Sequence, residues 1–224
     1  MLSSPRRHAV VTGASSGIGA AVTGRLLDDG WRVTALCRSE PDSRAEWIRA
    51  DLAGEFRSLL AAVSDVDAVV HAAGLQRSAP LSSLSAEDGA RMWAVHVSAA
   101  EVLVSSLSER LVDGGRVVLI GSRTMVGVPG KSQYAATKAA LSALARSWAA
   151  ELAPRRVTVN VVAPGPTDTP MLLDPGRVST PVRVPPLGRL VTPGEVAALV
   201  AFLLGSDGSS ITGQTLVVCG GASL

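Results

Sequence analysis

The sequence predicts an α/β protein built on a parallel, doubly wound sheet. Short runs rich in valine and alanine alternate along the chain with longer segments whose apolar residues recur at helical spacing. Such alternation is typical of right-handed β-α-β crossovers, which place helices on both faces of a parallel sheet. A glycine-rich turn directly follows the first short run, at a point where sheets of this kind bind ligands. We therefore expect one domain over residues 1–224.

The composition is that of a globular protein and argues against several classes. Of 224 residues, 47% are hydrophobic and 18% are charged, and the formal net charge is +2. The arginines are scattered, so we expect neither nucleic acid nor a membrane as a partner. Cys37 and Cys219 lie far apart and the histidines are dispersed, so we expect no disulfide framework and no metal site. A short polar start without room for a signal peptide, and no long apolar run, predict a cytoplasmic protein.

Residues 1–71 are expected to supply four strands and two helices. The strand candidates are short apolar runs, and the helix candidates carry apolar residues at helical spacing. Gly30 provides a stop for the first helix. The expected strands are residues 9–12, 32–38, 46–49 and 67–71, and the expected helices are residues 20–29 and 54–63.

The rest of the chain continues the same alternation of strands and helices. Asp113-Gly-Gly is expected to turn the chain between a long helix and the next strand, and Thr192 and Glu195 are expected to cap the last helix. Residues 172–186 are proline-rich without clear periodicity, so we expect either a substrate-covering loop or an unstructured insert. The remaining expected elements are helices over residues 86–111, 132–153 and 193–204 and strands over residues 116–122, 157–163 and 213–221.

The glycine-rich turn is a candidate phosphate-binding site. Glycines let the backbone approach a diphosphate, and the start of the following helix presents free N–H groups and a partial positive charge. A merely tight turn is the alternative, but the strand-turn-helix context favours phosphate binding. The candidate contacts are Gly13, Ser15, Ser16, Gly17, Ile18 and Gly19.

The end of the second strand is expected to select the cofactor. In a dinucleotide site, an acidic residue here favours NAD, whereas an arginine accommodates the 2′-phosphate of NADP. The strand ends with Cys37-Arg38 and no acid, so we predict NADP(H), with Arg38 as the phosphate contact. Glu40 nearby keeps NAD(H) open, and Arg38 as an ordinary exposed arginine is the alternative. Asp51 and Leu52, after the third strand, are expected beside the adenine ring.

Tyr134-Ala-Ala-Thr-Lys138 is the candidate catalytic stretch. Tyr134 is the only tyrosine of the chain, and a helix would place it on one face with Lys138. A nearby ammonium stabilises the phenolate and lowers a pKa that is about 10 in a free side chain. Such a pair exchanges protons near neutral pH. A buried core tyrosine beside a solvated lysine is the alternative.

In order and spacing, these residues resemble the short-chain dehydrogenase/reductase family over essentially the whole chain. Within it, the resemblance is to bacterial 3-oxoacyl reductases and the ketoreductases of secondary metabolism. The motifs that carry it are Thr12-Gly-x-x-x-Gly17-x-Gly19, Ala73-Gly74, Ser122, Tyr134-x-x-x-Lys138, Asn160 with Pro164-Gly165, and Ile211-Thr-Gly-Gln214.

The resemblance implies a Rossmann-type domain with seven parallel strands in the order 3-2-1-4-5-6-7. It implies reduction of a carbonyl to an alcohol, or the reverse, with NADPH and a small to medium, partly apolar substrate. Tyr134 would exchange a proton with the substrate oxygen, while Lys138 would lower the tyrosine pKa and hold the nicotinamide ribose. Ser122 would hydrogen-bond the carbonyl as the cofactor delivers hydride. The implied further cofactor contacts are Ala73, Gly74, Tyr134, Lys138, Pro164, Gly165, Thr167 and Thr169.

Three positions depart from the family pattern. His96 stands where the family usually has an asparagine that supports a water relay behind the lysine. Histidine donates, accepts and titrates near neutrality, so His96 is a catalytic candidate, with a packed helix histidine as the alternative. The usual Asn-Asn-Ala-Gly reads His71-Ala-Ala-Gly74, which is expected to alter cofactor-side hydrogen bonding. Ser122 precedes Tyr134 by one residue fewer than in most relatives, so the placement of Ser122 stays open.

Two other functions remain open at this point. One is a protein of the same family that binds NAD(P) with weak or no redox activity, in a regulatory or structural role. The other is a dehydratase or isomerase on the same scaffold. The resemblance also implies a homodimer or homotetramer formed through the helices at residues 94–110 and 134–153, although core packing would give the same alanine-rich pattern.

Overall fold

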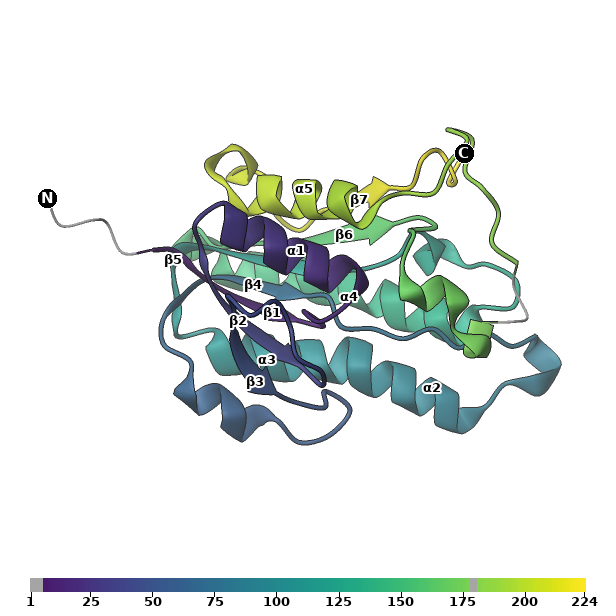
Figure 1. Cartoon of the computed structure of the whole chain (residues 1–224), viewed down its shortest axis with the longest axis horizontal. Helices are drawn as coiled ribbons and strands as arrows, with labels where there is room; N and C mark the ends of the chain where they lie inside the picture. The colour runs from purple at the N-terminus through teal and green to yellow at the C-terminus, as the bar shows by residue number, and fades with distance from the viewer. Residues whose placement is uncertain (1–5, 178–180) are drawn as a thin grey trace, which may run out of the picture.

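Seven parallel strands form one sheet in the computed structural model, which describes residues 6–177 and 181–224 (Figure 1). Their order is β3-β2-β1-β4-β5-β6-β7, so the predicted doubly wound sheet is confirmed. The order reverses between β1 and β4, where the carboxyl ends of doubly wound strands open a crevice for ligands. The strands are β1 (His8–Thr12), β2 (Arg32–Cys37), β3 (Glu46–Arg49), β4 (Val66–His71), β5 (Leu111–Ile120), β6 (Thr158–Pro164) and β7 (Thr215–Val218).

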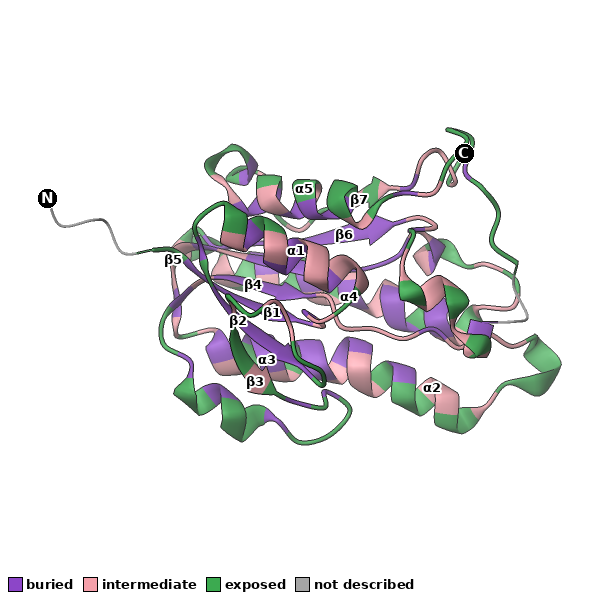
Figure 2. Ribbon diagram, in the orientation of Figure 1, coloured by how far each residue is buried: buried purple, intermediate pink, exposed green. Residues whose placement is uncertain are grey.

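Helices cover both faces of the sheet because parallel strands bury both of their sides. Val22 of α1 and Val200 of α5 belong to the core on one face, and Leu103 of α3 and Leu141 of α4 belong to the core on the other. Figure 2 shows the central strands buried along their length and the outer helix faces exposed. The α-helices are α1 (Gly17–Asp28), α2 (Ala86–Trp93), α3 (Ala99–Leu107), α4 (Ser132–Leu152) and α5 (Pro193–Leu204).

The long helix expected over residues 86–111 contains an irregular turn and ends earlier. Between α2 and α3 the chain forms a π-helical turn, Ala94–Ser98, of a kind that is frequent at functional sites. After α3 the chain enters β5 already at Leu111, so the turn expected at Asp113-Gly-Gly is wrong. That segment is instead an irregularity inside β5, and Gly114 at a φ of 78° makes it sterically acceptable.

Other segments are shorter than expected. The helix expected at residues 54–63 is only the 3₁₀ helix Arg57–Ala62, because Leu60 is its single buried anchor. The closing strand expected at residues 213–221 is limited to β7. Part of the expected loop at residues 172–186 forms the 3₁₀ turns Pro170–Leu173 and Pro175–Arg177, and residues 178–180 lie outside the described residues.

A membrane-spanning helix and a metal-binding group of side chains are both absent from the part of the chain that the structure describes. No described helix has the length and apolar character needed to cross a bilayer. Nor do the histidine, cysteine, aspartate and glutamate side chains of this part gather into a group that would hold a metal ion.

Candidate active site

The turn between β1 and α1 has the geometry that a diphosphate requires. A Cβ on Gly19 would lie 2.1 Å from the Gly13 carbonyl oxygen, and Gly13 itself has a φ of 67°. Ser16, which precedes the first helical residue, makes no side-chain capping bond, so the first N–H groups of α1 stay available. These residues therefore fit the phosphates of a dinucleotide.

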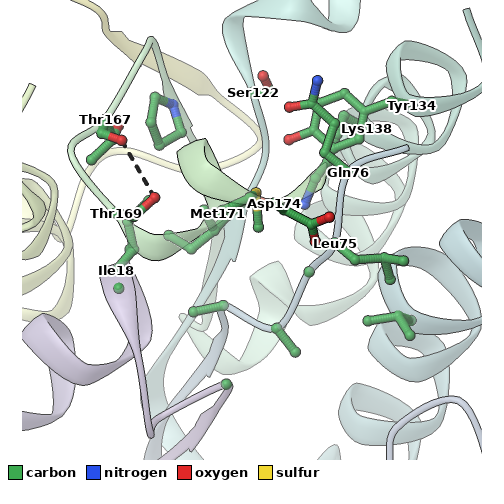
Figure 3. Close-up of a pocket in the computed structure, with 18 of the residues that line it drawn as sticks. Ile18, Leu75, Gln76, Ser122, Tyr134, Lys138, Thr167, Thr169, Met171 and Asp174 are labelled. Carbon is green, nitrogen blue, oxygen red and sulfur yellow. Dashed lines mark hydrogen bonds between the residues drawn. The ribbon is translucent and has the colours of Figure 1, made fainter. Parts of the chain in front are cut away.

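A single cleft of about 910 Å³ collects the predicted cofactor contacts at the carboxyl ends of the strands. Arg38, exposed beyond β2, lines it together with Asp51 and Leu52 after β3. Thr167 and Thr169 line the wall beyond β6, where the Thr169 hydroxyl donates to the Thr167 carbonyl at 3.3 Å (Figure 3). The other predicted contacts that line the cleft are Gly13, Ser15, Ser16, Gly17, Ile18, Gly19, Ala73, Gly74, Tyr134, Lys138, Pro164 and Gly165.

Tyr134 and Lys138 meet in this cleft, as the helical spacing predicts. Both side chains are buried on α4, and the Lys138 ammonium lies 6.0 Å from the centre of the Tyr134 ring. The ammonium is anchored by donating to the carbonyl oxygen of Ile120, 2.8 Å away at the end of β5. Figure 3 shows both side chains in the same region of the cleft as Ser122 and Gln76.

Ser122 occupies the first position after the β5 strand and its following glycine. Its Oγ accepts a hydrogen bond from the Thr124 N–H at 3.2 Å and lies 2.9 Å from the Thr124 hydroxyl. The Ser122 hydroxyl acts to lower the pKa of Tyr134, and both residues line the same cleft.

Burial shifts the pKa values of both Tyr134 and Lys138. Burial raises the pKa of Tyr134 above 10.0, and the Ser122 hydroxyl and the charge of Arg177 offset this only in part. Burial also lowers the pKa of Lys138 to about 7. The positive charge that acts on the phenol is that of Arg177, and the lowering of the tyrosine pKa by Lys138 stays a prediction.

His96 lies in the π turn behind the cleft and does not line it. Its Nε2 accepts the Leu75 N–H at 3.1 Å, so Nδ1 carries the proton and donates to the Thr137 hydroxyl oxygen at 2.8 Å. Burial, followed by the charge of Lys138, holds the pKa of His96 well below 6.5. In this arrangement the ring is neutral and both of its nitrogens are engaged, and the catalytic role expected of His96 stays a prediction.

A second buried histidine ties the glycine turn to the same π turn. The Thr12 hydroxyl accepts the backbone N–H groups of Ala72 and Ala73 at 3.1 and 3.2 Å, so it donates to His71 Nδ1 at 2.9 Å. His71 Nε2 in turn donates to the carbonyl oxygen of Val95 at 3.1 Å. The replacement of the usual asparagine by His71 thus gives a neutral bridge from β4 to the helix, and burial lowers its pKa to about 3.

We predict that His96→Ala destabilises the protein without changing its catalytic ionisations. Loss of a buried ring and of two hydrogen bonds is expected to lower the free energy of unfolding by about 2–4 kcal/mol. Urea unfolding measures that change, and a pH profile of turnover is the second readout. Disappearance of an ionisation between about pH 5 and 8 in the variant would show that His96 titrates after all.

Several cleft residues have no signal in the local sequence pattern, because loops supply them. Arg77 pairs with Asp174 at 3.0 Å, and Ser78 N–H donates to the Gly176 carbonyl at 3.0 Å. These contacts fasten the turns at residues 170–177 to the loop after β4. Gln76, buried beside them, lines the cleft as well.

The fold and the site together define a Rossmann-type, nucleotide-dependent oxidoreductase. Residues 49–223 match the family model described as Enoyl-(Acyl carrier protein) reductase, which spans more than half of the chain. The chain belongs to the short-chain dehydrogenase/reductase family and is an NAD(P)-dependent oxidoreductase.

Individual relatives are similar to this chain over nearly their full length. The chain is 34% identical to the 3-oxoacyl-[acyl-carrier-protein] reductase FabG of Vibrio cholerae serotype O1, across 95% of this chain and 96% of that protein. A short-chain dehydrogenase from Burkholderia cenocepacia, solved in complex with NADP, is 35% identical with a TM-score of 0.86, across 97% of this chain and 98% of that one. A blue fluorescent protein from a metagenomic library, solved in complex with NADPH, is 32% identical with a TM-score of 0.85 and the same coverage.

Proposed function

We propose that the protein reduces the carbonyl of a small to medium, partly apolar substrate to an alcohol with NADPH. The observation that carries the proposal is the buried Tyr134, which lies beside Ser122 and Lys138 in the cleft lined by the glycine turn. Relatives and neighbours named as a reductase and as NADP or NADPH complexes support it.

Ser122, Tyr134 and Lys138 have separate roles in the proposed reduction. The bound nicotinamide cofactor supplies the hydride. The Thr124 N–H donates to the Ser122 oxygen, and when the Thr124 hydroxyl donates to it as well, the Ser122 hydroxyl proton can bond the substrate oxygen as that oxygen gains charge. Tyr134 then gives its proton to the same oxygen, and its raised pKa keeps it protonated until that moment. Lys138 holds the nicotinamide ribose and, with a pKa of about 7, exchanges a proton near neutral pH.

The direct test is NADPH oxidation by the purified protein across a panel of ketones, aldehydes and oxo acids, with product analysis. Formation of an alcohol in proportion to the NADPH consumed supports the proposal. NADPH binding without turnover of any carbonyl would reject it in favour of a non-catalytic binding protein.

We predict that Arg38→Asp shifts cofactor preference from NADPH to NADH. The arginine is exposed and lines the cleft beyond β2, the end of the strand where an arginine accommodates the 2′-phosphate in dinucleotide sites. Loss of a charge-assisted contact, with repulsion added, is expected to change the NADPH:NADH ratio of kcat/KM by at least about tenfold. Steady-state kinetics with both cofactors measures the ratio, and an unchanged ratio removes Arg38 from phosphate recognition.

We further propose a cytoplasmic homodimer or homotetramer. Both cysteines are buried and free, which suits a reducing compartment. Val102, Leu144 and Trp148 line a groove between α3 and α4, and Ala143 and Ser147 are exposed on α4, which suits helix pairing between subunits. Light scattering after size-exclusion chromatography tests the assembly, and a monomer at micromolar concentration would reject it.

A further inference from the structure

Three cations line the cleft close to Tyr134 without a carboxylate partner. Arg123 follows Ser122, Lys131 directly precedes α4, and Arg177 ends the second 3₁₀ turn. Among the described residues, none of the three makes an ion pair. Arg123 and Lys131 come from the connection between β5 and α4, and Arg177 comes from the turns after β6, so the fold brings two distant segments together here.

Arg177 is the strongest element of this cluster because it is removed from water. Arg177 is 8% exposed, and among the described residues the only hydrogen bond of its side chain runs from Nη1 to the Met171 carbonyl oxygen at 3.3 Å. Within that same part of the chain, its Nε is buried without a partner, as is the Nε of Arg123. A buried guanidinium with free donors is unfavourable unless an anion arrives to bind it.

The acid that lies in the same loop is already engaged. Asp174 pairs with Arg77 at 3.0 Å and accepts the Gly176 N–H at 2.8 Å. The charge of Asp174 also acts on Arg177, but the carboxylate forms its ion pair with Arg77 and none with Arg177 among the described residues.

Arg123 and Arg177 influence the pKa of Lys131, and Arg177 also influences the pKa of the Tyr134 phenol. Burial lowers the pKa of Lys131, and the charges of Arg177 and Arg123 lower it further. Arg177 also acts to lower the pKa of Tyr134, so the cluster reaches the proposed proton donor. The phosphate contacts expected at the glycine turn and at Arg38 come from other elements, which separates this cluster from cofactor recognition.

We propose that the substrate carries an anionic group, a carboxylate or a phosphate, which binds Arg177 with Arg123 and Lys131 while the substrate carbonyl lies at Tyr134. This inference rests on the proposed carbonyl reduction and names the substrate class of the same site. The planar guanidinium of Arg177 presents paired donors that match either oxyanion.

The test compares charged and neutral forms of one ketone. Linear oxo acids, with the ketone at increasing distance from the carboxylate, are assayed with NADPH beside their methyl esters and beside acetoacetyl-CoA. We expect kcat/KM for the best acid to exceed that of its ester by at least about tenfold. Arg177→Met is expected to lower kcat/KM for the acid about 10- to 100-fold, chiefly through KM, and to change the ester less than about threefold. Arg177→Lys is expected to restore part of the preference.

Controls separate this cluster from general charge effects. Arg25→Met removes an exposed arginine of α1 and is expected to leave all rates unchanged. Lys131→Met, at a half-buried position, carries the test if Arg177→Met does not fold. Calorimetric binding of the oxo acid to the NADP-bound protein gives the same comparison without turnover.

The outcomes are distinct. A preference confined to acetoacetyl-CoA and lost in Arg177→Met assigns the anion to a phosphate, whereas a preference for the free acid assigns it to a carboxylate. Equal use of acid, ester and thioester, or a preference that survives in both variants, overturns the inference alone. Failure to reduce any of these compounds counts against the proposed function, and the calorimetric comparison then decides whether the anion site exists.

Discussion

Tyr134→Phe is expected to cut turnover at least about a hundredfold, the usual effect of losing an acid-base group. NADPH binding is expected to stay within about threefold of the unmodified protein, because phenylalanine keeps the ring that packs against His96 at 5.6 Å between centroids. Steady-state turnover and NADPH fluorescence titration measure the two quantities. Retained activity in the variant would remove Tyr134 from the mechanism.

The same variant supplies a clean spectroscopic control. Tyr134 is the only tyrosine of the chain, so phenolate absorbance on raising the pH reports this side chain alone. We expect a pKa above 10.0 for the protein without ligands, because burial outweighs the Ser122 hydroxyl and the Arg177 charge. The signal is expected to vanish in Tyr134→Phe, and a pKa below 10.0 in the unmodified protein would contradict the burial argument.

Lys138→Met is expected to stabilise the protein while it abolishes turnover. Burial lowers the pKa of Lys138 from 10.5 to about 7. Between these values the unfolded chain binds more protons than the folded one, so stability rises with pH over that window. At pH 7 and below, the folded state carries the whole cost of charging the buried amine. Removing it is expected to add roughly 1–3 kcal/mol to the free energy of unfolding near neutral pH, after loss of the Ile120 hydrogen bond is subtracted.

Urea unfolding at neutral and alkaline pH measures this difference. The advantage of Lys138→Met over the unmodified protein is expected to shrink as the pH rises from about 7 toward 10, since the unfolded lysine then loses its proton too. A variant that is less stable at neutral pH would mean that the ammonium is well solvated or paired in the folded protein.

The sheet and the cofactor side of the cleft followed from local sequence. Valine-rich runs predicted the central strands because both of their faces are buried, and Gly13 and Gly19 predicted the turn because backbone contacts there exclude a side chain. The Tyr134–Lys138 pair followed from helical periodicity alone.

The substrate side of the cleft depends on contacts between distant segments. Arg77 and Asp174 are 97 positions apart, so no local sequence pattern predicts their pairing. Their ion pair holds the 3₁₀ turns at residues 170–177 against the loop after β4. The π turn around His96 was missed for a similar reason, because the Val95 carbonyl finds its partner in His71 on β4.

The most direct measurement mixes the NADPH-loaded protein with a reducible oxo compound and follows nicotinamide oxidation and proton uptake together in weak buffer. Reduction by hydride from NADPH and a proton relayed through Tyr134 predicts one proton taken from solvent for each NADPH oxidised and each alcohol formed, with both signals lost in Tyr134→Phe. NADPH oxidation without proton uptake or alcohol, or equal rates in the unmodified protein and Tyr134→Phe, would contradict it.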